Sequence, residues 1–136
     1  VRAEMAKCDA NACIFTDLAD IAWLFNIRGN DVKYLPVALS YAIVEKQKAY
    51  VFMDAAKGQY INYLPDIKRV LRKGGLLISD NVLQEGEIVQ SKYGVTRRNR
   101  TIHERMREYV YMLTHSDEVV TSVVPIGDGI TLSVKQ

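Results

Sequence analysis

The sequence predicts an α/β fold: a single three-layer sandwich, with a mixed sheet of about six strands and about four helices covering its faces. Three observations carry this prediction. The chain has 136 residues, of which 49% are hydrophobic, enough for one domain with a real core. Its first half contains a short-turn hairpin. From about residue 53, strand-type and helix-type segments alternate, which is typical of sheets with helices packed against them.

The first half is predicted to hold two helices and three strands. Asp17 can cap the second helix, because its carboxylate can accept hydrogen bonds from the free N–H groups of the first turn. Only the polar run 45–48 separates the last two strands. So short a connection makes this pair an antiparallel hairpin. The expected elements are a helix at 1–10, a strand at 12–16, a helix at 18–27, and strands at 37–44 and 49–53.

The second half is predicted to hold two helices and three strands. The run 76–79 is fully apolar, so we expect a central strand that is buried on both faces. The final two strands flank Gly127-Asp128-Gly129, which is turn chemistry for a hairpin. On the longest helix, Ile102, Met106, Tyr109, Val110 and Leu113 are expected to point inward. The expected elements are a helix from about 61 or 64 to 72, a strand at 76–79, a loop at 84–96, a helix at 99–115, and strands at 119–124 and 130–134.

Composition excludes several classes of protein. A net charge of +2 is too small to predict nucleic-acid or anionic-membrane binding. No apolar run approaches the ~20 residues of a membrane span, and the early acid Glu4 does not fit a signal peptide. We therefore expect a cytoplasmic, recombinantly expressed protein.

Cys8 and Cys13 have no second pair with which to build a zinc site, so we expect two reduced thiols.

Other candidate functional residues have simpler structural interpretations. Trp23, beside Leu24 and Phe25, is expected in the core, with a dimer contact as the alternative. His103 and His115 have no nucleophile or metal-ligand partner at a useful spacing and are expected at the surface or at a helix cap. A basic cluster around the long helix is interleaved with Glu104 and Glu108, which favours a solvated, salt-bridged face. Its members are Arg97, Arg98, Arg100, Arg105 and Arg107.

Residues 1 to about 52 resemble the N-terminal domain of the creatinase/aminopeptidase P/prolidase family. The stretch DIAWLFNIRG, residues 20–29, is the most specific part of the likeness. The resemblance implies a non-catalytic domain that supports dimer contacts and shapes access to a dinuclear metal site on a separate C-terminal domain. The ligands of that metal site map onto no position of this chain.

Residues from about 51 to 136 resemble the C-terminal half of a class I O-methyltransferase. The matching stretches include FMDAAKGQYINYLPDIKRVLRKGGLLISDNV and TRRNRTIHERMREYVYMLTHSDEVV. The likeness is to bacterial members similar to catechol O-methyltransferase, some of which modify tRNA uridine. It implies that Asp54, Asp80 and Asn81 correspond to the ligands of a divalent cation, and that Lys57 corresponds to the catalytic lysine.

These residues make chemical sense as a metal site. If the strands that end before Asp54 and Asp80 were parallel neighbours, the oxygen ligands would gather at one edge of the sheet. Two carboxylates and an amide oxygen are hard ligands suited to Mg²⁺ or Ca²⁺. The alternative is a set of polar residues that merely cap turns at strand ends.

Residues 1–52 contain one glycine, Gly29, and no glycine-rich loop for S-adenosylmethionine. We therefore expect vestigial sites, no cofactor, and at most weak Mg²⁺ or Ca²⁺ binding.

The two resemblances meet within residues 49–54, a strand that both families can supply. We therefore predict one chimeric domain, 1–136, made of an aminopeptidase-like segment 1–52 and a methyltransferase-like segment 53–136. A join inside a strand favours an engineered or library-selected protein, because natural fusions more often link whole domains. We expect it to fold without catalysing a reaction. The alternatives are a minimal metal-dependent S-adenosylmethionine O-methyltransferase and a homodimerising interaction module.

Overall fold

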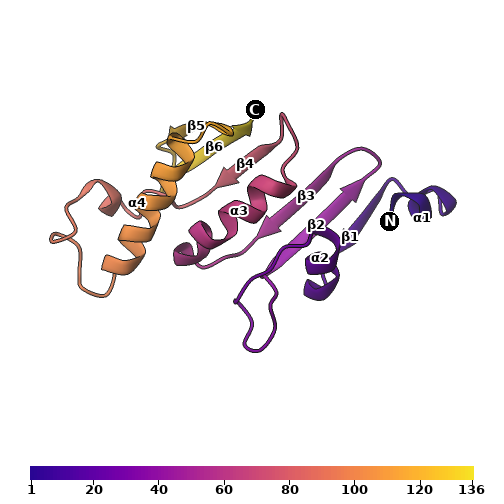
Figure 1. The fold of residues 1–136 in the computed structure, drawn as a ribbon, viewed down its shortest axis with the longest axis horizontal. Coiled ribbons are helices and arrows are strands. Elements are labelled where there is room, and N and C mark those ends of the chain that lie inside the picture. Colours follow the sequence, from indigo (N-terminus) through magenta and orange to yellow (C-terminus); the bar gives the residue numbers. More distant parts are fainter. The chain divides into compact units, whose positions relative to one another are not determined.

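The computed structural model describes residues 1–136, which divide into two compact units, Val1–Ala56 and Lys57–Gln136. The boundary falls just after the predicted join at residue 52. Figure 1 labels the elements of both units. Cooperative folding of 1–136 as one domain stays a prediction.

The first unit is a three-stranded antiparallel sheet with a helix packed on it. The strand order is β1-β2-β3, and the β2–β3 pairing confirms the predicted hairpin. The Asp17 side chain accepts hydrogen bonds from the N–H groups of Ala19 and Asp20, which confirms the predicted cap. The elements are α1 (Arg2–Lys7), β1 (Ala12–Phe15), α2 (Leu18–Phe25), β2 (Ser40–Glu45) and β3 (Ala49–Met53).

The core of the first unit lies between α2 and one face of this sheet. Ile21 and Ala22 of α2 are buried, as are Ala42 and Val44 of β2. The prediction that Trp23 belongs to the core is wrong, because its side chain is 80% exposed. A helix turns by about 100° per residue, so on a helix that buries Ile21 and Ala22, residue 23 starts to point away from the sheet. Both cysteines are free thiols.

The second unit is a three-stranded antiparallel sheet with two helices. The strand order is β4-β6-β5, so the last strand of the chain lies between the other two. The hairpin around Gly127–Gly129 is confirmed by the β5–β6 pairing. The elements are α3 (Tyr60–Val70), β4 (Leu76–Ser79), α4 (Arg100–Thr114), β5 (Val119–Val124) and β6 (Ile130–Lys135), with short 3₁₀ turns at Lys57–Gln59 and Glu87–Val89.

One hydrophobic cluster holds the second unit together. On α4 the buried stripe runs through residues 103, 106, 109 and 113, the spacing that places side chains on one helix face. The predictions for Ile102 and His103 are wrong: Ile102 is 38% exposed, whereas His103 is only 1% exposed. The buried cluster consists of Leu64, Val82, Ile88, Met106, Tyr109, Leu113 and Val119.

The predicted single mixed sheet of six strands is wrong. The six strands form two separate three-stranded sheets, and every pairing within them is antiparallel. β4, expected to be a central strand, is an edge strand with Leu76 and Ile78 exposed. A short apolar run predicts a strand but not its partner, and β6 occupies the position beside β4. No helix in the structure is both long and apolar enough to cross a bilayer.

Candidate functional site

The candidate site in the second unit begins where β4 ends, at Asp80 and Asn81. Asn81 has a left-handed backbone, with φ of 57°, a conformation that asparagine tolerates better than most residues. The Oδ1 atom of Asp80 accepts a hydrogen bond from the Asn81 N–H at 2.7 Å. The Tyr60 hydroxyl donates to the Asp80 backbone carbonyl at 3.4 Å. These contacts hold the two residues in a tight turn.

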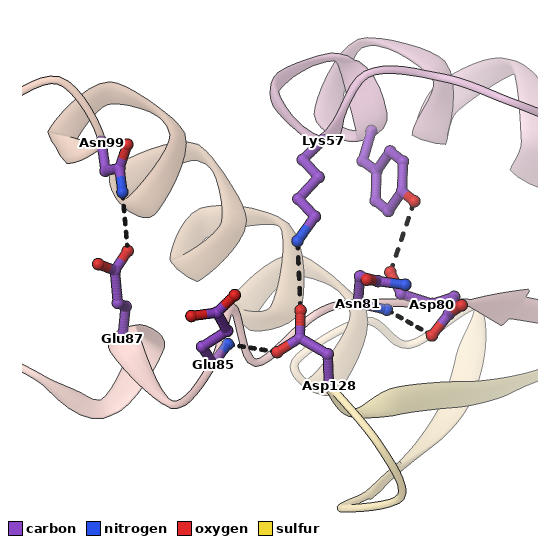
Figure 2. Close-up of polar contacts among 8 residues, drawn as sticks. Lys57, Asp80, Asn81, Glu85, Glu87, Asn99 and Asp128 are labelled. Atoms are coloured by element: carbon purple, nitrogen blue, oxygen red, sulfur yellow. Dashed lines mark hydrogen bonds and ion pairs between the residues drawn. The ribbon is translucent and has the colours of Figure 1, made fainter.

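Lys57 reaches this corner from the segment before α3 and pairs with Asp128 of the β5–β6 hairpin (Figure 2). The Lys57 Nζ to Asp128 Oδ2 distance is 3.2 Å, and both side chains are partly buried. The other carboxylate oxygen of Asp128 accepts a hydrogen bond from the Glu85 N–H. Asp128 therefore joins three segments that are far apart in the sequence.

Backbone contacts fasten the same hairpin to the loop after β4. The N–H groups of Val82 and Leu83 donate to the carbonyls of Gly129 and Asp128 at 3.0 and 2.9 Å. Gly129 has a φ of 80°, and a Cβ atom placed there would lie 2.1 Å from Leu83 Cγ. Position 129 therefore requires glycine, both for its backbone conformation and for the close approach of Leu83.

Replacing Asp128 by asparagine is expected to lower the free energy of unfolding by about 1 kcal/mol. The amide oxygen can still accept from the Glu85 N–H, so the variant removes mainly the ionic contact with Lys57. Lys57→Met is expected to cost a similar amount, and the double variant less than the sum. Urea denaturation measures all three. Lys7→Met is the matched control, because the Lys7–Glu4 pair is highly exposed and should contribute almost nothing. Strict additivity at positions 57 and 128 would contradict the assignment.

The predicted metal ligands belong to both units. Asp80 and Asn81 are adjacent in the second unit. Asp54 follows β3 in the first unit, where its N–H donates to the Leu39 carbonyl at 2.9 Å. The condition for the predicted gathering, parallel pairing of β3 with β4, is not met, because these strands belong to different sheets. No group of three or more His, Cys, Asp or Glu side chains is placed to hold a metal ion.

The second unit by itself offers a sparse ligand set for a divalent cation. Ca²⁺ takes about six to eight oxygen ligands, and Mg²⁺, which keeps several waters, is usually held by one or two carboxylates. This corner offers the single carboxylate of Asp80 and the amide oxygen of Asn81. One Asp80 oxygen already accepts from the Asn81 N–H, and the nearby Asp128 carboxylate is engaged by Lys57 and Glu85. No catalytic step is therefore derived through a metal. Lys57, the predicted vestigial lysine, serves here as an ion-pair partner.

Sequence reasoning missed two features of this unit. Tyr109 is buried, and its hydroxyl lies 2.5 Å from Ser79 Oγ. Burial raises the pKa of Tyr109 to about 12. His103 is buried with no hydrogen-bond partner at either ring nitrogen. Residue 103 lies at helical spacing from residues 106 and 113, and this spacing could have predicted that His103 is buried. Nothing local in the sequence connects Ser79 with Tyr109.

The basic cluster differs from the predicted salt-bridged face. Glu104 pairs with Lys92 rather than with an arginine. This contact lowers the pKa of the Glu104 carboxyl, first through the hydrogen bond and then through the charge of Lys92. Arg105 and Arg107 instead donate to the backbone carbonyls of Gly58 and Gln90, at 3.0 and 3.2 Å. These arginines therefore anchor α4 to neighbouring turns.

Over part of its length, the chain is similar to solved structures described as O-methyltransferases. A protein from Staphylococcus aureus described as a caffeoyl-CoA O-methyltransferase is 26% identical, with a TM-score of 0.51, over 54% of this chain and 35% of that chain. An O-methyltransferase structure from Klebsiella pneumoniae is also 26% identical, with a TM-score of 0.51, over 61% of this chain and 38% of its own.

Sequence comparison points to a second family. The sequence model of the creatinase/prolidase N-terminal domain matches residues 1–81, so the chain belongs to this family. A probable Xaa-Pro aminopeptidase P of Sordaria macrospora is 41% identical over 75 residues, which are 55% of this chain. Aminopeptidase P1 of Lotus japonicus is 36% identical over 80 residues, 59% of this chain. The chain spans 11% of the length of each of these relatives.

The two sets of likenesses fit a composite chain. The aminopeptidase family match continues past the predicted join at residue 52 into the segment that resembles a methyltransferase. The family match therefore extends beyond the 1–52 bounds predicted for the aminopeptidase-like segment.

Proposed function

We propose that this polypeptide is a recombined composite of two enzyme fragments, engineered or selected from a library, that folds without catalysing the reaction of either parent. The observation that carries the proposal lies immediately before Asp54. There, β3 pairs with β2 in an antiparallel hairpin of creatinase-type sequence. In a complete methyltransferase, this position follows the half of the sheet that holds the methyl donor.

The contacts of the candidate site support the absence of methyl transfer. Lys57 is engaged by Asp128, and the loop after β4 is held by hydrogen bonds within the protein. A general base must lie within hydrogen-bonding reach of a bound substrate, and Asp80 and Asn81 supply only one carboxylate and one amide oxygen to a cation that would orient such a substrate. The proposal thus treats Lys57, Asp80 and Asn81 as residues that now serve the fold.

The aminopeptidase likeness supports the same conclusion for peptide cleavage. The family matched is an N-terminal domain, and this chain spans 11% of the length of the curated aminopeptidases. Metal-dependent hydrolysis needs a bound metal to activate water. No set of His, Cys, Asp and Glu side chains with that arrangement is present in the structure.

Four measurements on the full 136-residue chain test the proposal. We expect no binding of S-adenosylmethionine by isothermal titration, no transfer of a labelled methyl group to a catechol, and no cleavage of an Xaa-Pro peptide above background. We also expect no thermal shift with Mg²⁺ or Ca²⁺ at about 10 mM, roughly ten times the dissociation constant of weak cation sites.

The alternative of a minimal O-methyltransferase predicts a different pattern. Methyl transfer that requires Mg²⁺ and is lost in both Asp80→Ala and Lys57→Met would establish that alternative and overturn the proposal. Glu104→Ala is the matched control, because it removes an exposed acid of the same unit that lies outside the candidate site. Peptide cleavage abolished by a chelator would overturn the proposal from the aminopeptidase side.

A further inference from the structure

The loop after β4 contains a turn with an unusual backbone, at the start of a segment, residues 84–90, that we call the strap. Gln84, Glu85 and Gly86 all have positive φ angles, of 51°, 54° and 81°. The Gly86 N–H donates to the Leu83 carbonyl at 3.0 Å, so the chain reverses here in the manner of a type I′ turn. Such a turn is normally built from asparagine and glycine, which tolerate the left-handed region. Gln84 and Glu85 are therefore held in a conformation that their side chains disfavour.

The side chain of Gln84 adds a second unfavourable feature. It is only 8% exposed, and its Oε1 atom has no hydrogen-bond partner within the protein. A buried polar atom without a partner is costly, because it has given up its hydrogen bonds with water. Opening of the strap would return this amide to water and would release the left-handed turn at the same time.

One carboxylate holds the strained turn closed. Asp128 accepts a hydrogen bond from the N–H of Glu85, in the middle of the turn (Figure 2). The carboxylate is itself fixed by Lys57, whose Nζ lies 3.2 Å from Oδ2. A charged acceptor makes a stronger hydrogen bond than a neutral one. We therefore call the Asp128 carboxylate the latch of the strap.

The far end of the strap is held by weaker contacts. Asn99 Nδ2 donates to Glu87 Oε2 at 3.4 Å, which is longer than a typical hydrogen bond, as Figure 2 shows. Arg107 donates to the Gln90 carbonyl at 3.2 Å in an exposed position. Ile88, in contrast, is buried in the hydrophobic cluster of the unit. One aliphatic side chain and the latch are thus the main contacts that keep the strap closed.

The residues just before the strap are firmly placed. Val82 is fully buried, and its N–H donates to the Gly129 carbonyl at 3.0 Å. The N–H of Leu83 donates to the Asp128 carbonyl at 2.9 Å. These backbone contacts do not depend on the conformation of the turn, so an opening motion would begin after Leu83.

We infer that the strap is a strained local element that opens while the rest of the second unit stays folded, and that the Asp128 carboxylate is the latch that keeps it closed. Strain of this kind persists only where surrounding contacts enforce it, and local opening is drawn from the least stable parts of a fold. Opening uncovers Ile88 and releases one Asp128 oxygen beside Lys57. The corner that contains Lys57 therefore has two states.

Hydrogen exchange of the full chain, followed for single amides by NMR, tests this inference. The reporters are the amides of Glu85, Glu87 and Ile88, which donate to Asp128 Oδ1, to the Gln84 carbonyl and to the Leu83 carbonyl in the closed strap. The amides of α3 are the reference. In the parent chain, the reporters should be protected, yet they should exchange roughly tenfold or more faster than the reference amides.

Glu85→Gly isolates the strain of the turn. The Glu85 side chain is exposed, and only its N–H contacts the latch, so glycine relieves the left-handed backbone without removing that contact. Exchange at Glu87 and Ile88 should become about fivefold slower. Gln90→Gly is the matched control, because Gln90 lies in the same strap with an ordinary φ of −78°. Added backbone freedom there should make exchange faster.

Asp128→Ala tests the latch. It should speed exchange of the reporters roughly tenfold relative to α3, because the turn loses its charged acceptor. Lys57→Met leaves the contact between Asp128 and the strap in place and should have a smaller effect.

Three results would overturn the inference. The first is a parent chain in which reporters and reference amides exchange at the same rate, because the strap would then open only when the unit unfolds. The second is a change in the same direction for Glu85→Gly and Gln90→Gly. The third is unchanged reporter exchange in Asp128→Ala. Far-UV circular dichroism checks each fold, and if Asp128→Ala unfolds, the two glycine variants carry the test.

Discussion

Replacing Leu113 by alanine is expected to lower the free energy of unfolding of the second unit by about 3 kcal/mol. Leu113 is fully buried in the cluster formed by α3, α4 and β5. Alanine removes most of the buried side chain and leaves a cavity that the neighbouring residues can only partly fill. Since the whole stability of a small domain is typically only 5–15 kcal/mol, this one change should be plainly visible in a denaturation curve.

Met112→Ala is the matched control for this change. Met112 is the neighbouring residue on the same helix, but its side chain is 37% exposed. Alanine is a slightly better helix former than methionine, so the control should change stability by less than about 0.5 kcal/mol. A similar loss for both variants would mean that Leu113 does not lie in a tightly packed core.

Hydrogen exchange read separately over residues 1–56 and 57–136 completes the experiment. We expect Leu113→Ala to reduce protection in the second unit alone, because the first unit has its own sheet and its own buried residues. An equal loss of protection in both units would instead establish one cooperative domain, as the sequence analysis predicts.

The second large effect is expected at high pH. The pKa of Tyr109 is raised from 10.0 to about 12 in the folded protein, chiefly because burial disfavours the phenolate. The unfolded chain therefore releases this proton first as the pH rises. The stability is unaffected below pH 10, falls between about pH 10 and 12, and drops by about 3 kcal/mol across that window.

Tyr109→Phe isolates this contribution from the other tyrosines and lysines. The variant loses the hydrogen bond to Ser79 and should be less stable near neutral pH by about 1–2 kcal/mol. Its stability should then fall less steeply than that of the parent chain above pH 10. Urea denaturation of both proteins from pH 8 to 11.5 supplies the comparison. Parallel curves for the two proteins would show that Tyr109 does not titrate abnormally.

Local signals in the sequence predicted most of the elements of this fold. All six strands and four helices appear close to their predicted positions, and the Asp17 cap and both tight hairpins are confirmed. These features depend on side-chain alternation, helical spacing and turn residues over fewer than about fifteen positions. The grouping of the strands into two sheets depends on long-range pairing, which an apolar run such as 76–79 does not specify.

The candidate site was predictable only where neighbouring residues or a family likeness supplied it. Asp80 and Asn81 could be predicted as site residues because they directly follow a predicted strand. The partner of Lys57, by contrast, is Asp128, which lies on a hairpin distant in the sequence and looked like ordinary turn chemistry. Asp54 and Asp80 were expected together on the assumption of parallel strands, but the strands that precede them belong to two different antiparallel sheets.

The exposed position of Trp23 has a practical consequence for spectroscopy. It is the only tryptophan of the chain and lies on α2, in the first unit. Indole emission therefore carries no direct signal from the second unit, where tyrosines are the only strong chromophores. With its ring largely in water, Trp23 should emit at long wavelength and be accessible to iodide even in the native protein. Fluorescence melting curves would thus report directly on the first unit, and the second unit needs a separate probe.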